Sequence, residues 1–254
     1  MIIDANTYIG HWPFRRLRYN TVEGLVKLMD RCGVDKTVCG SINSVFYKDC
    51  QEGNEELAED VDEYPERIIP FATVNPAYVA WREDLERSVK DLGMKGLRIY
   101  PLYHNYSLAD PRLGELLKEA AALRVPVEIP LRIVDVRQRH WMDVTRTLTL
   151  DEVAGLVKAY PENHFILLNG IGYEKTQFAE MKQNNYRIEI SRLTVLLTKT
   201  IPRLIETLGA SKLVFGTGMP FSYPEPALLK MELLEAGLEV KEAIYWRNLA
   251  EFLQ

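Results

Sequence analysis

The stretch KGLRIYPLYHNYSLADPRLGELLKEAAALRVPVEIP, residues 95–130, holds one complete strand–helix–strand unit. Two short apolar runs, KGLRIY and VPVEIP, flank a longer segment in which apolar residues recur at i, i+3, i+4 and i+7. The pair Asp110-Pro111 is a typical helix start, because proline is tolerated in the first helical turn. Strands with continuous apolar runs are buried on both faces, so the unit is typical of a parallel sheet covered by helices.

The same alternation runs along the whole chain. Strand-like runs are expected at residues 2–8, 36–42, 67–74, 95–100, 125–130, 164–169, 186–191 and 212–217. Helical periodicity fills most of the segments between them, and Gly33, Gly93 and Gly209 lie where helices should end. Eight such units in 254 residues predict an α/β fold, a (β/α)8 TIM barrel, because such barrels have about 250 residues. We expect a single domain over residues 1–254, and no G-x-G-x-x-G follows the first strand to favour a dinucleotide fold.

Composition excludes several function classes. Lys+Arg number 31 against 36 Asp+Glu, so the chain lacks the basic stripe that nucleic-acid binding requires. No apolar run reaches the ~20 residues that are needed to cross a membrane, and we expect the protein to bind no membrane. Cys32, Cys39 and Cys50 are odd in number with no C-x-x-C pair, and no leader-like segment is seen, so we expect a reduced, cytoplasmic protein. Assembly into a homo-oligomer is left open.

Several segments in order carry a family likeness. They include IIDANTYIG (2–10), YPERIIPFATVNP (64–76), MKGLRIYP (94–101), HFILLNGIG (164–172), LVFGTGMPF (213–221) and WRNLAEFL (246–253). With these segments the chain resembles the amidohydrolase superfamily, in particular the branch of aromatic-acid decarboxylases and lactone hydrolases. The resemblance implies a TIM barrel whose catalytic site holds a divalent metal at the carboxyl ends of the strands.

The chain departs from that family at each expected metal ligand. The resemblance implies a His-x-His after the first strand, where this chain has Asn6 and Tyr8. It implies further ligands where this chain has Pro130, Asn169 and Gly218. Proline and glycine side chains offer no donor to a metal. The only histidines, at 11, 104, 140 and 164, lack the i, i+2 or i+4 spacing of a replacement pair. We therefore expect a hydrolase-like chain with no metal site and no cofactor.

Strand alternation predicts a charged inner wall. Successive side chains of a strand point to opposite faces, which groups the inward residues as Asp4, Asn6 and Tyr8; Arg98 and Tyr100; Glu128 and Pro130; Arg187, Glu189 and Ser191. Because a buried carboxylate needs a compensating partner, we expect Arg98 to pair with Glu128 or Glu189. If Asn169 points inward, His164 should point to the helix layer.

Two interpretations of those carboxylates stay open. In one, Arg98, Glu128 and Glu189 form a structural ionic network that fills the volume of a lost metal. In the other, Glu128 or Glu189 is a catalytic general acid or base whose pKa is raised by burial.

The loops after strands one, four and five concentrate arginine, histidine and aromatic residues on the face where barrel enzymes carry their sites. Arginine forks bind carboxylates and phosphates in bidentate geometry, so this rim suits a small anionic ligand. The candidate ligand-binding residues are Asn6, Tyr8, His11, Trp12, Arg15, Arg98, Tyr100, His104, Arg132, Arg137, His140 and Asn169. The alternative is that these arginines only solvate a surface or pair with neighbouring Asp and Glu, and that Trp12 and Trp141 plug the barrel mouth or a subunit contact.

Three function classes follow. The first is a metal-independent hydrolase or lyase that keeps the small-molecule pocket of the family. The second is a catalytically inactive homologue that binds a metabolite. The third is a structural or interaction protein, and the fold alone does not choose among them.

Overall fold

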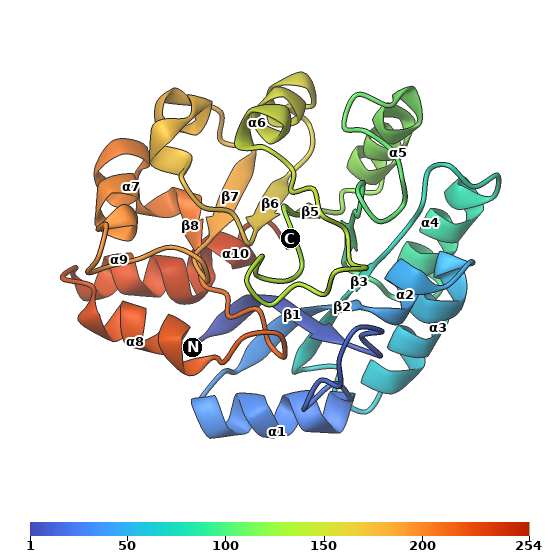
Figure 1. Ribbon diagram of the computed structural model, residues 1–254, viewed down its shortest axis with the longest axis horizontal. Helices are drawn as coiled ribbons and strands as arrows, with labels where there is room; N and C mark the ends of the chain where they lie inside the picture. The colour runs from blue at the N-terminus through green and yellow to red at the C-terminus, as the bar shows by residue number, and fades with distance from the viewer. Residues whose placement is uncertain (254) are drawn as a thin grey trace.

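The computed structural model describes residues 1–253, and its core is a closed barrel of eight parallel strands ringed by helices (Figure 1). Neighbouring strands follow chain order from β1 to β8. The ring closes where Ala5 N donates to Phe215 O at 2.9 Å and Tyr8 N donates to Met219 O at 2.9 Å. The predicted (β/α)8 architecture is confirmed.

The strands are short, and all eight are parallel to their neighbours. They are β1 (Ile3–Ile9), β2 (Lys36–Ser41), β3 (Ile68–Ala72), β4 (Gly96–Arg98), β5 (Val127–Pro130), β6 (Phe165–Leu168), β7 (Tyr186–Glu189) and β8 (Leu213–Val214).

Helices connect the strands on the outside of the barrel, and the helices after residue 220 follow the last strand (Figure 1). They are α1 (Val22–Cys32), α2 (Asn43–Phe46), α3 (Cys50–Val61), α4 (Trp81–Lys90), α5 (Pro111–Ala122), α6 (Leu150–Ala159), α7 (Thr200–Leu208), α8 (Glu225–Leu233), α9 (Leu238–Glu242) and α10 (Asn248–Ala250). Shorter helical turns are η1 (Tyr173–Lys175), η2 (Gln177–Glu180), η3 (Ala210–Lys212) and η4 (Ala243–Arg247).

Local sequence explains where these helices begin and end. The Asp110 side chain caps α5 by accepting from Arg112 N, and Pro111 occupies its first turn. Thr149 caps α6 in a reciprocal arrangement with Glu152. Gly33 ends α1 with φ 68°, the left-handed conformation that glycine adopts without a steric penalty. These signals are local, which is why they could be predicted.

The barrel interior has three layers. The layer at the amino ends of the strands is apolar and comprises Ile3, Ala5, Val38, Phe71, Ile166, Leu168, Val214, Leu249 and Phe252. Above it lie the buried ions Arg98, Glu128 and Glu189, each 0% exposed. The carboxyl ends of the strands are covered by a third, mostly aromatic cluster. Because the layers on either side are mostly apolar, each buried ion needs a partner or hydrogen-bond donors within its own layer.

Two predicted orientations are wrong. The register of β1 against β2 shifts between Asp4 and Thr7, so Ala5 joins the apolar interior and Asp4 does not share a face with Asn6 and Tyr8. Asp4 instead accepts from Thr217 N at 3.0 Å and from Thr217 Oγ1 at 2.5 Å.

His164 does not point to the helix layer. Its ring stacks on Phe252 of the apolar interior layer with the centroids 4.3 Å apart. The left-handed backbone of Asn169, with φ 58°, breaks the alternation on which that prediction relied.

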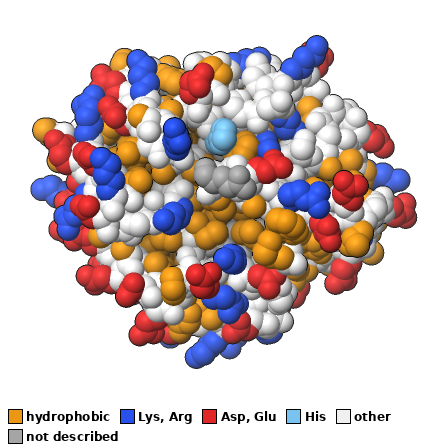
Figure 2. Space-filling model, turned by 180° about the vertical axis from the view of Figure 1, so that it is seen from behind, with side chains coloured by type: hydrophobic (Ala, Val, Ile, Leu, Met, Phe, Trp, Pro, Cys, Tyr) orange, Lys and Arg blue, Asp and Glu red, His pale blue; other side chains and the backbone are white. Residues whose placement is uncertain are grey.

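The outer surface carries charges of both signs. Figure 2 shows one face, on which apolar side chains gather at the centre and Lys, Arg, Asp and Glu alternate around them. This view has none of the single-sign stripe that a phosphate backbone attracts. Among residues 1–253, no helix combines the length and the apolarity that crossing a membrane demands.

Candidate anion-binding site

A guanidinium group occupies the middle of the barrel. Arg98 Nε donates to Glu128 Oε2 at 2.6 Å, and Arg98 Nη1 donates to Thr7 O at 2.9 Å. The guanidinium carbon lies 4.6 Å from the centroid of the Tyr8 ring. A Cβ at position 40 would lie 2.9 Å from Arg98 Nη1, so Gly40 makes room for this side chain. The expected pairing of Arg98 with Glu128 is confirmed.

Burial governs the titration of this pair. Burial raises the pKa of Glu128 to about 7, with the positive charge of Arg98 opposing it. Burial alone would lower the pKa of Arg98, but the carboxylate of Glu128 outweighs it and raises that pKa above its ordinary value. The guanidinium is therefore a permanent positive charge inside the barrel.

Glu189 sits in a separate nest of donors. Its Oε2 accepts from Ser191 Oγ at 2.8 Å, from Asn6 Nδ2 at 3.2 Å and from Asn169 N at 3.2 Å. Ser191 N donates to Oε1. Burial raises the pKa of Glu189, while these donors oppose the increase. Gly216 leaves the space for this carboxylate, since a Cβ there would lie 2.4 Å from Glu189 Cγ.

The barrel mouth above these ions is filled by aromatic rings. Trp12, 3% exposed, packs edge-to-face on Phe221 at 5.0 Å and on Phe46 at 5.4 Å between centroids. Tyr8 contacts Phe221 in the same manner at 5.2 Å. The ring of Trp12 is thus packed in the mouth, as the structural alternative predicts, whereas Trp141 is 80% exposed and does not plug it. The assignment of Trp12 as a ligand-binding residue stays a prediction.

A cavity of about 610 Å³ lies to one side of this plug. Its floor includes Ser191, which follows β7, and Thr217, which follows β8. Six arginines line it, and no Asp or Glu is among its lining residues; the arginines are Arg15, Arg16, Arg18, Arg31, Arg137 and Arg192. The volume is in the range of small-molecule sites.

Few carboxylates offset this charge. Asp135 accepts from Arg137 Nε at 3.0 Å and from Arg192 Nη1 at 2.6 Å, so one carboxylate serves two guanidinium groups. Hydrogen bonding to Arg137 lowers the pKa of Asp135 below its ordinary range. Arg31 pairs with Glu225 at 2.8 Å. Within residues 1–253, Arg15, Arg16 and Arg18 form no ion pair. The lining of the cavity therefore keeps an excess of positive charge.

The structure brings together only part of the predicted ligand set. Arg15 and Arg137 both line the 610 Å³ cavity, and Arg15 Nη2 donates to Gln138 Oε1 at 3.3 Å, which joins the loops after β1 and β5. The other candidates in the barrel do not line it. Asn6, Tyr8, Arg98, Tyr100 and Asn169 are at most 2% exposed.

The three histidine candidates are not among the lining residues of the cavity. His104 Nε2 lies 3.2 Å from Val45 O, and burial lowers its pKa to about 4. His140 stacks on Phe14 with the centroids 5.5 Å apart. His11 is exposed, and its backbone N–H donates to Asn43 Oδ1 at 2.8 Å. These three histidines were predicted as ligand residues, and the structure gives them no common pocket.

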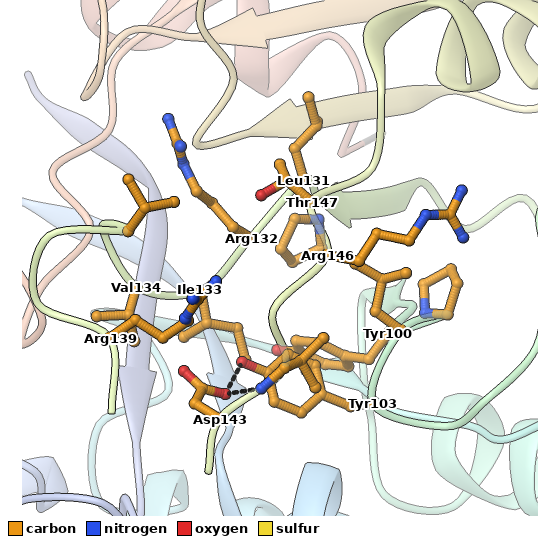
Figure 3. Close-up of a pocket in the computed structure, with 15 residues that line it drawn as sticks. Tyr100, Tyr103, Leu131, Arg132, Ile133, Val134, Arg139, Asp143, Arg146 and Thr147 are labelled. Atoms are coloured by element: carbon orange, nitrogen blue, oxygen red, sulfur yellow. Dashed lines mark hydrogen bonds between the residues drawn. The ribbon is translucent and has the colours of Figure 1, made fainter. Parts of the chain in front are cut away.

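Arg132 belongs to a second, much smaller pocket beside Tyr100 (Figure 3). In that view Arg132 and Arg146 extend in different directions, while Tyr103 donates to Asp143 Oδ1 at 2.9 Å. The volume is about 20 Å³, which holds about one water molecule. This site is too small for a metabolite.

The prediction missed several lining residues. Arg31 comes from α1 and Arg192 from the loop after β7, while Thr217 and Ser222 come from the segment after β8. The position of Arg192, just after a strand with inward polar residues, was a usable signal. Arg31 lies in the last turn of a helix, where a basic residue is ordinary, so nothing in the sequence marked it.

Comparison with known proteins agrees with this architecture. The profile of the amidohydrolase family matches residues 41–254. The chain belongs to the amidohydrolase family. The match leaves out β1 of this family member, the strand that carries Asn6 and Tyr8. No curated protein matches the chain in sequence.

Solved structures share the fold of this amidohydrolase-family chain over nearly its whole length. A dihydroxybenzoic acid decarboxylase from Polaromonas sp. JS666, with bound manganese and the inhibitor 2-nitroresorcinol, is 19% identical with a TM-score of 0.76, covering 99% of this chain and 96% of its own. A 2,6-dihydroxybenzoate decarboxylase complexed with 2,6-dihydroxybenzoate is 18% identical, with a TM-score of 0.75 and coverages of 99% and 98%. A probable 2-pyrone-4,6-dicarboxylic acid hydrolase from Acinetobacter baumannii, with citric acid bound, is 15% identical, with a TM-score of 0.68 and coverages of 99% and 98%.

The residues at the strand ends of this family member do not fit a divalent cation. Burial raises the pKa of Tyr8 and of Tyr100, so both phenols stay protonated and are poor ligands. Their hydroxyls and Glu128 Oε1 have no hydrogen-bond partner within the described chain, but neither has Arg98 Nη2 beside them. A fixed guanidinium there repels a second cation. Residues 1–253 contain no group of three or more His, Cys, Asp or Glu that could hold a metal.

Proposed function

We propose that this amidohydrolase-family barrel binds a small anionic molecule in the arginine-lined cavity and does so without a divalent metal. The observation that carries the proposal is the lining itself, six arginines without an acidic residue around about 610 Å³. Guanidinium forks hold carboxylates and phosphates by paired, charge-assisted hydrogen bonds.

Electrostatics supports an anion in particular. Like charges gathered in one concave surface repel one another, and a low-dielectric wall strengthens the field in the cavity. Asp135 and Glu225 are the two carboxylates paired with lining arginines, which leaves Arg15, Arg16 and Arg18 to be neutralised by a ligand. The ligands in the related structures, 2,6-dihydroxybenzoate and citric acid, are carboxylates of a size that suits this volume.

The metal-independent part of the proposal rests on Arg98. The family relative from Polaromonas holds manganese, whereas here a buried guanidinium paired with Glu128 supplies the positive charge of the barrel centre. An anion at the arginine cavity needs no further cation to neutralise it.

Isothermal titration with citrate and with 2,6-dihydroxybenzoate tests the proposal. Arg15→Ala and Arg137→Ala should each weaken binding by about 10-fold or more, because a charge-assisted hydrogen bond contributes about 1.5–3 kcal/mol. Arg112→Ala is the matched control, since Arg112 pairs with Asp110 at 2.7 Å just as Arg137 pairs with Asp135, two residues before it, but lies on α5. Equal effects of Arg112→Ala and Arg137→Ala, or no binding of either anion, would contradict it.

A second candidate is metal-independent hydrolysis or decarboxylation of the bound anion. It is favoured by one contact, the hydrogen bond from the cavity-floor hydroxyl of Ser191 to the buried carboxylate of Glu189. Glu128 has no such route, because Arg98 holds it and it is 0% exposed. Loss of turnover in Glu189→Gln but not in Glu128→Gln would support the enzymatic candidate; unchanged turnover in Glu189→Gln would remove it.

A further inference from the structure

We propose that Ser191 selects, among anions, those that also carry a hydroxyl group, by accepting a hydrogen bond from that hydroxyl. This inference rests on the proposed function, since it assumes that an anion enters the arginine-lined cavity. It adds a chemical class: a hydroxylated polycarboxylate, or an equivalent hydroxylated polyanion.

The first step concerns where the proton of Ser191 points. Ser191 Oγ donates to Glu189 Oε2 at 2.8 Å, and Glu189 is 0% exposed. A serine hydroxyl has one proton and two lone pairs. Turning that proton toward a ligand would take a donor from a buried carboxylate, which is unfavourable. The proton of Ser191 therefore stays in the hydrogen bond to Glu189.

The second step concerns the lone pairs of Ser191 Oγ. Its other polar neighbour, Asn169 Oδ1 at 3.3 Å, is an acceptor and supplies no proton. Within residues 1–253, no group donates a hydrogen bond to Ser191 Oγ, and Ser191 lines the cavity. Ser191 thus brings to the cavity an acceptor that no group of these residues uses, whereas the six arginines offer donors only.

The other aliphatic hydroxyls of the cavity, those of Thr217 and Ser222, differ in this respect. Thr217 Oγ1 donates to Asp4 Oδ2 at 2.5 Å, but it also accepts from Met219 N at 3.1 Å and is 1% exposed. Ser222 Oγ forms no hydrogen bond within the described chain and is free to donate to an anion. Ser191 differs from both because its proton is bonded to a buried carboxylate while its oxygen accepts from no group in the described part of the protein.

The ligand class follows from both surfaces together. Six guanidinium groups favour several anionic groups on one molecule. A hydroxyl on the same molecule needs an acceptor once it leaves water, and Ser191 Oγ provides it. Citrate has both features, whereas tricarballylate is the same tricarboxylate without the hydroxyl.

Titration of citrate and tricarballylate into three proteins tests the inference. The unmodified chain should bind citrate about 5-fold or more tightly than tricarballylate, the effect of one neutral hydrogen bond. Ser191→Ala should remove that preference by weakening citrate alone. Ser222→Ala, the control from the same cavity, should weaken both ligands alike and keep the preference. L-malate against succinate repeats the comparison with dicarboxylates.

Each result is decisive. Equal affinity of the unmodified chain for citrate and tricarballylate overturns the inference, as does a preference that survives Ser191→Ala. In both cases the proposed function still stands if Arg137→Ala weakens the two ligands. If Ser191→Ala does not fold, Ser191→Thr, which keeps the hydroxyl, should keep the preference, and its loss there would count against Ser191 as the acceptor. Absence of any binding refutes the proposed function instead.

Discussion

At the scale of single residues, the polar side chains inside the barrel are explained by the partners that each buried charge needs. Arg98 and Glu128 form an ion pair at 2.6 Å where neither is exposed. Glu189 depends on Ser191, Asn6 and Asn169 instead. Two of these three donors, Asn6 and Asn169, stand where the family resemblance implies metal ligands. In this structure those two positions donate hydrogen bonds to a buried carboxylate.

Removal of the central guanidinium tests its structural role. Arg98→Met should lower the free energy of unfolding by about 3–5 kcal/mol, because Glu128 loses its partner and must either stay charged and unpaired in the barrel or take up a proton. The double variant Arg98→Met with Glu128→Gln should recover part of that loss. Arg82→Met, which breaks an exposed pair with Glu115, should cost at most about 1 kcal/mol. Denaturation in urea measures all three, and a loss in Arg98→Met no larger than in Arg82→Met would refute the role.

Prediction of single residues from the sequence succeeded where side chains alternate regularly between the two faces of a strand. It failed where the backbone departs from that alternation. The pairing of Arg98 with Glu128 followed from two inward positions on adjacent strands. The position of Asp4 did not, because the register shift between Asp4 and Thr7 depends on how β1 pairs with β2. The left-handed backbone of Asn169 likewise has no signature in an apolar run.

At the scale of elements, caps and strands were predictable because their signals are local. The cavity was not, because it forms where the loop after β1 meets the loop after β5 and the segments after β7 and β8. Phe14 stacking on His140 and Arg15 donating to Gln138 join those first two loops. Such contacts between segments far apart in sequence leave no periodic pattern to read.

The packing of the β4–α5 loop against α2 predicts an acid sensitivity. Burial lowers the pKa of His104 from 6.5 to about 4. Below pH 6.5, His104 therefore binds a proton in the unfolded chain but not in the folded chain. The stability that depends on neutral His104 is present above pH 6.5 and is lost as the pH falls toward about 4. The loss reaches up to about 3 kcal/mol.

His104→Gln isolates this contribution. Urea denaturation at pH 7 and at pH 4.5 should show a smaller acid loss in the variant than in the unmodified chain. His11→Gln, which changes an exposed histidine, should leave the acid loss as it was. An acid loss that is the same in all three proteins would show that His104 is not the responsible group.

At the scale of the whole molecule, the barrel has its closed axis and its open cavity in different places. Its axis is closed by ions below and aromatic rings above, and the open volume lies beside the axis, between the loops that follow β1, β5, β7 and β8. The charge that faces a ligand comes from these loops. The proposal of metal-independent anion binding rests on this arrangement.

The most direct test of this account is the affinity for citrate measured by isothermal titration in EDTA and again with added manganese. We predict the same dissociation constant in both buffers, and a weakening of about 10-fold or more in Arg137→Ala in both. Binding that appears only with manganese, and that Arg137→Ala leaves unchanged, would contradict it.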